Sequence, residues 1–404
     1  MAMAPSPVSG RTCKSRRSTV ATALLPASGQ ACKHQGSKRS AAVLAASVDK
    51  VMHSAVGGAA SSSELATSSA NGRQSTVITY GSDCSGLGTD SIAIHRAALP
   101  GQSLKNEFAC ESSPFARRVL RHGKCRPALL FRDLKSAGRQ KAGSVDVYTA
   151  GPPCQPYSVA GNNAGEADSR CMLSRVVSYI REKQPKLFVI ENVKNLLSKR
   201  HKVTWDKMLG ELKSIQSGSD VAYNIRFKVL NSKHFGLPQN RERVYVVGCH
   251  RSVASGKFHW PTPMETPSLA SFLDEHPVAD TKKLSNTNLR NIDAALGQAK
   301  AAGLDPSSVN VVVDIGCSAS RANMMHDLCP AITKSRAAGR DFWLMSAARR
   351  LTILELLRLQ GFSSSDLDLH GVSERQVGAM VGNAMSVPVL SAVLQEGLRV
   401  CGMR

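Results

Sequence analysis

The stretch that decides the fold is "TVITYGSDCSGLGTDSIAIHRAAL", residues 76–99. Its first five residues are mostly β-branched or aromatic and favour a strand. The glycine- and serine-rich turn "GSDCSGLGTD" then leads into "SIAIHRAAL", whose apolar residues have helical spacing. A strand, a glycine turn and a helix form the first unit of a doubly wound α/β sheet. We therefore predict a Rossmann-like fold with a mostly parallel sheet.

The same alternation continues toward the middle of the chain. Further strands are predicted at 105–111 ("KNEFACE"), 144–150 ("SVDVYTA"), 185–193 ("PKLFVIENV") and 241–248 ("RERVYVVG"). Helical patterns occupy 113–123, 173–183 and 204–216 between them. After about residue 250, the Pro-rich break "WPTPMETPS" introduces weaker signals, which indicates a second, smaller domain.

This organisation gives four predicted segments. Residues 1–73 are predicted to form a disordered basic leader, and residues 74–250 the α/β domain. Residues 251–370 are predicted to form the smaller domain, and residues 371–404 to return to the α/β domain. The small, polar stretch "GGAASSSELATSSANGRQS" (57–75) is typical of a linker.

Charge and composition narrow the class of protein. The formal net charge is +22, from 52 Lys and Arg against 30 Asp and Glu, which favours a polyanionic partner such as nucleic acid. No apolar run reaches the roughly 18 residues of a membrane span, so we expect no membrane partner. The eleven cysteines include no Cys-x-x-Cys pair, so neither a metal site nor a disulfide framework is predicted. We expect an intracellular protein.

The leader points to a compartment. Residues 1–48 contain no acidic residue but several arginines and many Ser and Ala, which is typical of an organellar transit peptide or a disordered basic tail. A plastid or mitochondrion is predicted for the first case, and the nucleus is the alternative.

One cysteine stands in an unusually stiff loop, "GPPCQPYS" (151–158). Prolines fix φ and restrict the residues before them, so the thiol of Cys154 has a preset direction. A packed apolar cysteine would not need this, and a nucleophile would. The loop follows the predicted strand 144–150, and ligand-binding loops follow the carboxyl ends of strands in such sheets.

Other polar residues are predicted at the same edge. The glycine turn allows close backbone approach to a ligand, and Glu111, after the second strand, is placed for a ribose hydroxyl pair. Glu191 ends the apolar strand "LFVI", where partial burial would raise its pKa for proton donation to a ring nitrogen. Arg241 and Arg243 alternate around Glu242 and could bind an oxygen or a phosphate from one face.

Together, these motifs resemble the cytosine-C5 DNA methyltransferase family, from about Val77 to Leu394. "GPPCQPYS" resembles its catalytic loop, "ENV" (191–193) its acid motif and "GLPQNRERVYVVG" (236–248) its Gln-x-Arg-x-Arg motif. "RRLTILELLRLQGF" (349–362) and "GNAMSVPV" (382–389) resemble the last two motifs. The order of these motifs is the order in the family. The resemblance implies that residues 74–250 form the catalytic, S-adenosylmethionine-binding domain and that residues 251–370 form a small target-recognition domain.

The resemblance implies a mechanism and a set of roles. Cys154 would add to C6 of a flipped cytosine, Glu191 would contact N3 and the exocyclic amine, and Arg243 the ring O2. Arg241 would support the loop or a phosphate, and Arg170 would lie in the mobile loop that closes over the base. The cofactor would be S-adenosylmethionine, contacting Gly86, Leu87, Gly88, Glu111, Asp133, Pro153 and Asn383. The partner would be double-stranded DNA, and the protein a monomer.

Several positions depart from the family pattern. Cys84 stands where the family has an aromatic residue, and Thr89 replaces a glycine, which puts the cofactor geometry in question. Residues 251–345 contain ten Lys and Arg against nine acidic residues, although a DNA-reading domain is usually basic. The basic runs lie instead at 117–126 and 194–202.

Two alternatives stay open from the sequence. The tRNA-modifying branch of the family shares the scaffold, but it has a contiguous Cys-Phe-Thr, whereas Cys329 and Thr333 are separated here. It also tends to have Thr at the position of Ser158. A non-catalytic nucleic-acid-binding homologue is the second alternative, although such a protein would be expected to lose the cysteine, the acid or the arginines.

Overall fold

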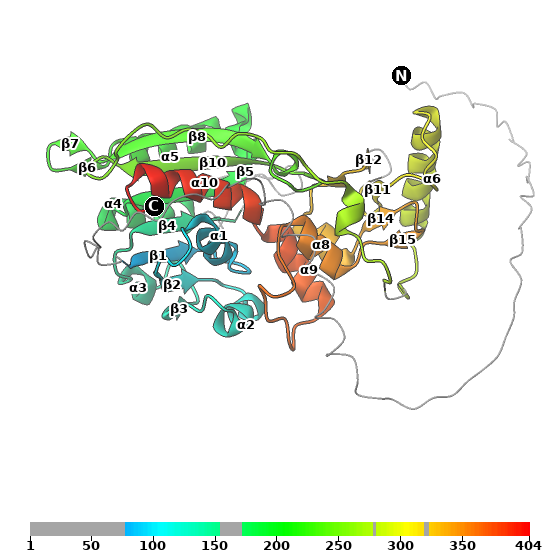
Figure 1. Cartoon of the computed structure of the whole chain (residues 1–404), viewed down its shortest axis with the longest axis horizontal. Helices are drawn as coiled ribbons and strands as arrows, with labels where there is room; N and C mark the ends of the chain where they lie inside the picture. Colours follow the sequence, from blue (N-terminus) through cyan, green and yellow to red (C-terminus); the bar gives the residue numbers. More distant parts are fainter. Residues whose placement is uncertain (1–76, 154–171, 278–279, 319–322) are drawn as a thin grey trace, which may run out of the picture. The chain divides into compact units, whose positions relative to one another are not determined.

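The computed structural model describes residues 77–153, 172–277, 280–318 and 323–404, all within one compact unit, Val48–Arg404 (Figure 1). The predicted leader, Cys154, Ser158 and Arg170 lie outside the described residues.

A seven-stranded sheet with the strand order β3-β2-β1-β4-β5-β10-β8 organises the structure (Figure 1). The first five strands in this order are parallel, and β10 runs antiparallel to both β5 and β8. The predicted doubly wound, mostly parallel sheet is therefore confirmed. The strands are β1 (Ile78–Asp83), β2 (Leu104–Cys110), β3 (Leu129–Phe131), β4 (Val147–Ala150), β5 (Leu187–Val193), β8 (Tyr223–Asn231) and β10 (Glu242–His250).

Helices cover both faces of this sheet, because successive strand residues point to opposite sides. On β5, Leu187 and Val189 pack under α1 and α10, whereas Phe188 and Ile190 pack under α4 and α5. The helices of this part are α1 (Thr89–Ala97), α2 (Pro114–His122), α3 (Ala137–Gln140), α4 (Leu173–Lys183), α5 (Lys202–Lys213) and α10 (Val387–Val400), with 3₁₀ turns η2 (Lys194–Leu197), η3 (Lys199–His201) and η4 (Ser232–His234). A hairpin of β6 (Gln216–Ser217) and β7 (Asp220–Val221) precedes β8.

A four-stranded antiparallel sheet, β12-β11-β14-β15, lies within the segment predicted as the smaller domain. One face packs on α6 through Val311, Val313 and Ala295, and the other joins the core beneath α8 and α9. The boundaries of the domains stay a prediction. The elements of this segment are η5 (Leu269–Phe272), α6 (Asn286–Ala301), β11 (Val311–Asp314), β12 (Asn323–His326), β13 (Cys329–Pro330), α7 (Lys334–Gly339), β14 (Phe342–Leu344), β15 (Arg349–Arg350) and α8 (Ile353–Leu359). Two elements outside the segment contact it: α9 (Glu374–Asn383) packs on α7, and β9 (Gln239–Asn240) pairs with β13.

The end of the chain returns to the large sheet. The carboxyl-terminal helix α10 packs against α1, β5 and β10 (Figure 1). Within the described ranges, no single helix is long and apolar enough to cross a bilayer, and only α9 and α10 taken together, at a 40° bend, pass that test.

The α7–α9 contact depends on two glycines of α9. A side chain at Gly382 would come 2.3 Å from the backbone carbon of Thr333, and one at Gly378 would come 2.3 Å from the carbonyl oxygen of Ala337. Both obstacles are backbone atoms, so the two helices could only separate. Close approach therefore requires glycine at both positions.

We expect Gly382→Ala to lower the free energy of unfolding by about 1–3 kcal/mol, as overpacking typically does. Alanine favours helix by up to about 1 kcal/mol over glycine, so the overlap must exceed that gain. Gly210→Ala in α5 is the matched control, because a side chain there meets nothing within 4 Å and should leave stability equal or higher. Denaturant unfolding of both variants measures the difference, and equal stabilities would contradict the steric argument.

Candidate functional site

The carboxyl ends of β1, β2, β4 and β5 bring the predicted site residues to one edge of the sheet. The turn 84–88 follows β1, Glu111 follows β2, and the loop 151–153 follows β4. The strand order reverses between β1 and β4, and ligands of open α/β sheets bind at such a switch point. Because β10 is antiparallel to β5, its start also lies at this edge, and Arg243 pairs with Val193.

The glycine turn has an unusual backbone. Cys84, Gly86 and Gly88 all have positive φ, at 57°, 54° and 78°. A side chain at Gly86 would meet nothing within 4 Å, so the outer side of the turn is open to a ligand. The side chain of Leu87 points inward instead, being 2% exposed within the core beneath α8 and α9. Of Leu87, only the backbone is therefore placed to contact a ligand.

Glu111 connects this turn to α2. Its Oε2 accepts a hydrogen bond of 2.9 Å from the amide of Gly86, and its Oε1 accepts one of 2.7 Å from the amide of Ser113. Arg117 donates to the carbonyl oxygens of Glu111 and Ser112. Ser112 Oγ also donates to Oε1 at 3.4 Å, whereas Oε2 keeps a second lone pair that can accept from a ligand hydroxyl.

Two hydrogen bonds hold the loop that leads to Cys154. Asn192 Nδ2 donates to the carbonyl of Pro152 at 3.2 Å, and the amide of Gly151 donates to the carbonyl of Asp83 at 3.3 Å. A side chain on Gly151 would lie 3.8 Å from Met385, in the segment that follows α9. Pro153, half-buried, is the last described residue before the predicted nucleophile.

Glu191 is buried beside Arg243. The Nε atom of Arg243 lies 3.3 Å from Oε1 of Glu191, and that oxygen accepts no hydrogen bond from the described residues. Burial raises the pKa of the Glu191 carboxyl above its ordinary value of 4.5, while Arg243 and Arg241 lower it in part. A buried carboxyl group with a raised pKa and an unused oxygen can exchange a proton with a bound group.

The guanidinium of Arg241 donates hydrogen bonds to backbone carbonyls, whereas that of Arg243 is ion-paired with Glu191. Arg241 is 2% exposed, and its guanidinium donates to the carbonyls of Ile332 (2.6 Å) and Ala384 (2.7 Å). It therefore joins the start of β10 to two distant segments. Of the predicted roles, support of a loop agrees with these contacts better than contact with a phosphate.

Two glutamines extend the connections of Arg241. Gln239 Nε2 donates to the carbonyl of Leu359 at 2.7 Å, and Gln360 Nε2 donates to the carbonyls of Val381 and Ala384. Like Asn192, both glutamines donate hydrogen bonds to backbone carbonyls of distant segments, and they thereby connect the segments around the site. All three residues stand within motifs that are recognisable in the sequence, but their side-chain partners, which lie in distant segments, are not predictable from those motifs.

The remaining predicted cofactor residues are exposed. Asp133 follows β3, and its Oδ1 accepts a hydrogen bond from the amide of Lys135 at 2.9 Å. Asn383 is the last residue of α9, next to the Ala384 carbonyl that Arg241 binds. The assigned roles of these residues stay predictions.

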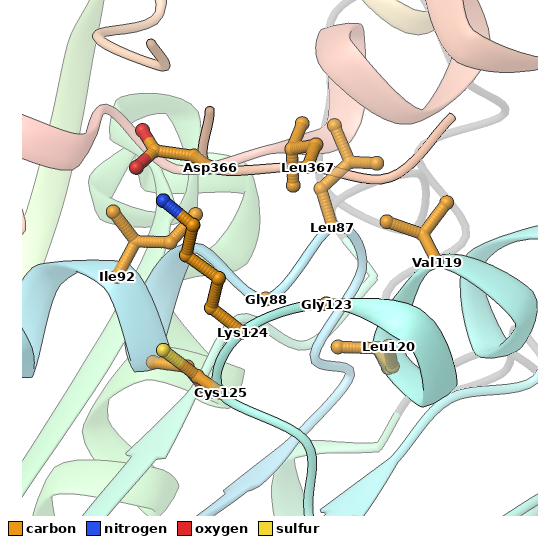
Figure 2. A pocket seen from close by; sticks show the side chains of 11 residues that line it. Leu87, Gly88, Ile92, Val119, Leu120, Gly123, Lys124, Cys125, Asp366 and Leu367 are labelled. Atoms are coloured by element: carbon orange, nitrogen blue, oxygen red, sulfur yellow. The ribbon is translucent and has the colours of Figure 1, made fainter. Parts of the chain in front are cut away.

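A small cavity of about 20 Å³ lies behind the glycine turn (Figure 2). Leu87 and Gly88 line it together with apolar residues of α1 and α2, and Lys124 and Asp366 flank it. A space of this size holds about one water molecule. It is too small for a nucleoside, so we place the candidate site at the strand ends.

The chain is similar to known proteins both in sequence and in fold. A family model described as C-5 cytosine-specific DNA methylase matches residues 82–398. The type II methyltransferase M.NgoBI of Neisseria gonorrhoeae is 33% identical over 291 residues, which cover 71% of this chain and 84% of that protein. Among solved structures, Entamoeba histolytica methyltransferase EhMeth has a TM-score of 0.57 at 15% identity, covering 80% of this chain and 98% of that one. Schizosaccharomyces pombe Dnmt2 methyltransferase has a TM-score of 0.52 at 16% identity, covering 80% and 99%. These two structures support the fold.

Proposed function

Since the chain belongs to the C-5 cytosine-specific DNA methylase family, we propose that it methylates C5 of a flipped cytosine in double-stranded DNA. The observation that carries the proposal is the buried Glu191–Arg243 pair, next to Asn192, which holds the loop leading to Cys154. An acid, an oxygen-binding cation and a directed thiol are the three groups that addition to a pyrimidine ring requires.

The residues at the strand ends fit S-adenosylmethionine, which supplies an electrophilic methyl group on a sulfonium sulfur. The open outer side of Gly86 admits close backbone approach, and Glu111 retains acceptor capacity for the ribose hydroxyls. Asp133, exposed after β3, would accept from the adenine amine. Gly88, Pro153 and Asn383 complete the proposed set, and Leu87 contributes through its backbone.

Cys154 begins the proposed reaction. Its thiolate forms a bond to C6, and the electron pair of the C5–C6 double bond becomes available at C5. That pair forms a bond to the methyl carbon as the bond between the methyl carbon and the sulfonium sulfur breaks, which releases S-adenosylhomocysteine, and C5 then loses its proton to water. The C6–sulfur bond then breaks, which restores the double bond and the thiolate.

Glu191 and Arg243 act on the ring during these steps. Glu191 donates a proton to N3 as the thiolate adds, so negative charge does not accumulate on the ring, and it recovers the proton on elimination. Arg243 hydrogen-bonds O2, and its charge keeps the ring in place. Because a ring carbon is inaccessible within a duplex, the base must leave the stack.

Two candidate substrates, duplex DNA and tRNA, are distinguished by one structural observation and by a direct labelling experiment. Cys329, at the position considered for the tRNA-modifying branch, is fully buried on β13, so its thiol is not accessible to a substrate. Purified protein with labelled S-adenosylmethionine should label duplex DNA far more than total tRNA. Bisulfite sequencing of DNA from a methylation-free host that expresses the protein should show 5-methylcytosine. Label mainly in tRNA would contradict DNA as the substrate and favour the tRNA alternative.

The basic run after β5 is the better candidate for phosphate contact. Lys199 and Arg200 are exposed on η3, six and seven residues after Val193, the last residue of β5. Lys202, in contrast, pairs with Asp206 at 2.6 Å. In the other run, Arg117 and Arg118 already donate to backbone carbonyls.

We expect Lys199→Gln/Arg200→Gln to weaken binding to all duplex sequences equally. The slope of log K against log salt should become shallower by about 0.9 for each phosphate that the protein no longer neutralises, or about 1.8 for two. Arg181→Gln/Lys183→Gln, at the end of α4 and so at the opposite edge of the sheet, is the charge-matched control and should leave the slope unchanged. Fluorescence anisotropy over a salt series measures both, and equal slopes would exclude this contact surface.

A further inference from the structure

A buried ion pair lies directly beneath the glycine turn. Asp83, the last residue of β1, is 1% exposed, and Arg139 of the short helix α3 is 2% exposed. Arg139 Nε donates to Oδ1 of Asp83 at 2.6 Å, and its Nη2 donates to Oδ2 at 2.5 Å, which makes the contact bidentate. Tyr148 on β4 donates to the same Oδ2 at 2.5 Å.

Aromatic rings enclose the guanidinium of Arg139. Its central carbon lies 4.4 Å from the ring centroid of Phe108 on β2 and 4.4 Å from that of Tyr179 on α4, with Phe131 on β3 at 6.0 Å. Rings at these distances attract a desolvated cation through their π faces. The arginine is therefore fixed by hydrogen bonds at its edge and by rings around it.

Stability alone does not account for a charge pair at this depth. Transferring two charges from water is costly, and well-packed apolar residues of similar volume often give equal or greater stability. What the pair provides is a defined geometry at one point, because a bidentate guanidinium–carboxylate contact fixes distance and orientation together.

The ion pair lies where β1, β2 and β4 end and the segments that carry the site residues begin. Asp83 pairs with Cys110 of β2 and Ala150 of β4, the residues immediately before Glu111 and Gly151. The Asp83 carbonyl accepts from the amide of Gly151. The next residue, Cys84, has a positive φ of 57°, which is uncommon for a residue other than glycine and must be maintained by its surroundings.

We propose that Arg139, acting through Asp83, is a positioning residue that holds the turn 84–88 and the loop 151–153 in the geometry for S-adenosylmethionine and for the thiol. The proposal rests on the proposed function. Arg139 itself contacts no reactant, because rings and the carboxylate of Asp83 enclose it.

The test removes both charges together, so that no unpaired charge stays buried. In Asp83→Leu/Arg139→Met, we expect a folded protein that binds S-adenosylhomocysteine at least tenfold more weakly by calorimetry, with KM for S-adenosylmethionine raised by the same factor. Amide hydrogen exchange of residues 84–88 and of Gly151, whose N–H is the one exchangeable amide of the Gly-Pro-Pro loop 151–153, should be faster without any ligand. Affinity, kcat and exchange within twofold of the wild-type values would overturn the proposal.

The matched control is a charge pair at the other end of the same strands. Asp146 accepts from Thr79 at 2.8 Å and pairs with Lys186 at 2.9 Å, at the amino-terminal edge. Asp146→Asn/Lys186→Met should change the melting temperature without changing affinity for S-adenosylhomocysteine. An equal loss of affinity in this control would overturn the proposal, because the effect would then be general to the sheet.

Arg139→Lys gives an independent measurement if the double variant does not fold. Lysine keeps the charge among the rings but lacks the planar fork, so we expect an intermediate affinity. Wild-type affinity in this variant would overturn the proposal, and so would failure of both variants to fold, since the pair would then serve the sheet and not the site. Wild-type protein that binds S-adenosylhomocysteine but methylates neither DNA nor tRNA would contradict the proposed function alone, because the exchange comparison does not depend on activity.

Discussion

Cys154→Ser protein is expected to lose methyl transfer by on the order of 10⁴-fold or more, as enzymes do when the attacking nucleophile is removed. A thiolate is the reactive form of cysteine, with an ordinary thiol pKa of about 8.5, whereas a serine hydroxyl is far less acidic and a weak nucleophile without a base. Cys154 itself lies outside the described residues. The loop before it is held by Asn192 and by the Asp83 carbonyl, so the substitution should not disturb the site around it.

Two measurements separate loss of chemistry from loss of folding. Cys154→Ser should bind S-adenosylhomocysteine with wild-type affinity and melt at the wild-type temperature. With DNA that contains 5-fluorocytosine, the wild-type protein should form a complex that survives denaturation, because fluorine cannot leave C5 as a proton does, and the variant should form none. Residual transfer within tenfold of the wild-type rate would show that Cys154 is not the nucleophile.

Glu191→Gln is expected to reduce kcat by about 10²–10⁴-fold, the usual contribution of a positioned general acid. The amide has the same shape and can donate a hydrogen bond, but it cannot transfer a proton to N3. Arg243 would keep its position near an uncharged partner. Steady-state methyl transfer measures this effect, and a reduction below threefold would contradict proton donation by Glu191.

The pH dependence provides a second test of the same residue. Burial raises the pKa of Glu191 above 4.5, so catalysis that needs its protonated form should decline as pH rises through that higher pKa. Glu191→Gln should remove this decline and leave only the rise that reflects ionisation of the thiol.

The free energy of unfolding should also depend on pH because of Glu191, since a pKa that differs between the folded and unfolded states links proton binding to folding. Between the unfolded pKa near 4.5 and the raised folded pKa, the folded state binds more protons, so the free energy of unfolding falls as pH rises through this window. The contribution is complete at low pH and absent above the folded pKa. Glu191→Gln should have a flatter stability profile there, and an unchanged profile would contradict the raised pKa.

Local patterns predicted the doubly wound class of the large sheet and five of its seven strands, β1, β2, β4, β5 and β10, but neither β3 nor β8. The strand–glycine turn–helix of residues 76–99 predicted a doubly wound sheet, and β1, the turn and α1 occupy those positions. The prediction was possible because period-2 and helical spacing are properties of neighbouring residues. The rule that ligands bind at carboxyl ends of parallel strands also placed Glu111 and Glu191 at one edge.

The family assignment likewise followed from the sequence, since motifs in a fixed order are a linear property, and the comparisons confirm it. The two arginines of "QNRERVY" show that the sequence pattern did not predict side-chain partners. Their alternation predicted one shared face, yet Arg243 meets Glu191 while Arg241 is buried on carbonyls of Ile332 and Ala384, 91 and 143 residues away.

The sequence by itself therefore determined the alternation of most strands and helices between residues 76 and 250, the family, and which residue types stand at the strand ends. Only the tertiary structure decided which polar group each of them meets. It placed Asn192 on the Pro152 carbonyl, Arg139 on Asp83 at a separation of 56 residues, and the glycines of α9 against the backbone of α7. The physical reason is that periodicity arises from neighbours along the chain, whereas a buried donor must find its acceptor in whatever segment the packed core brings within about 3 Å.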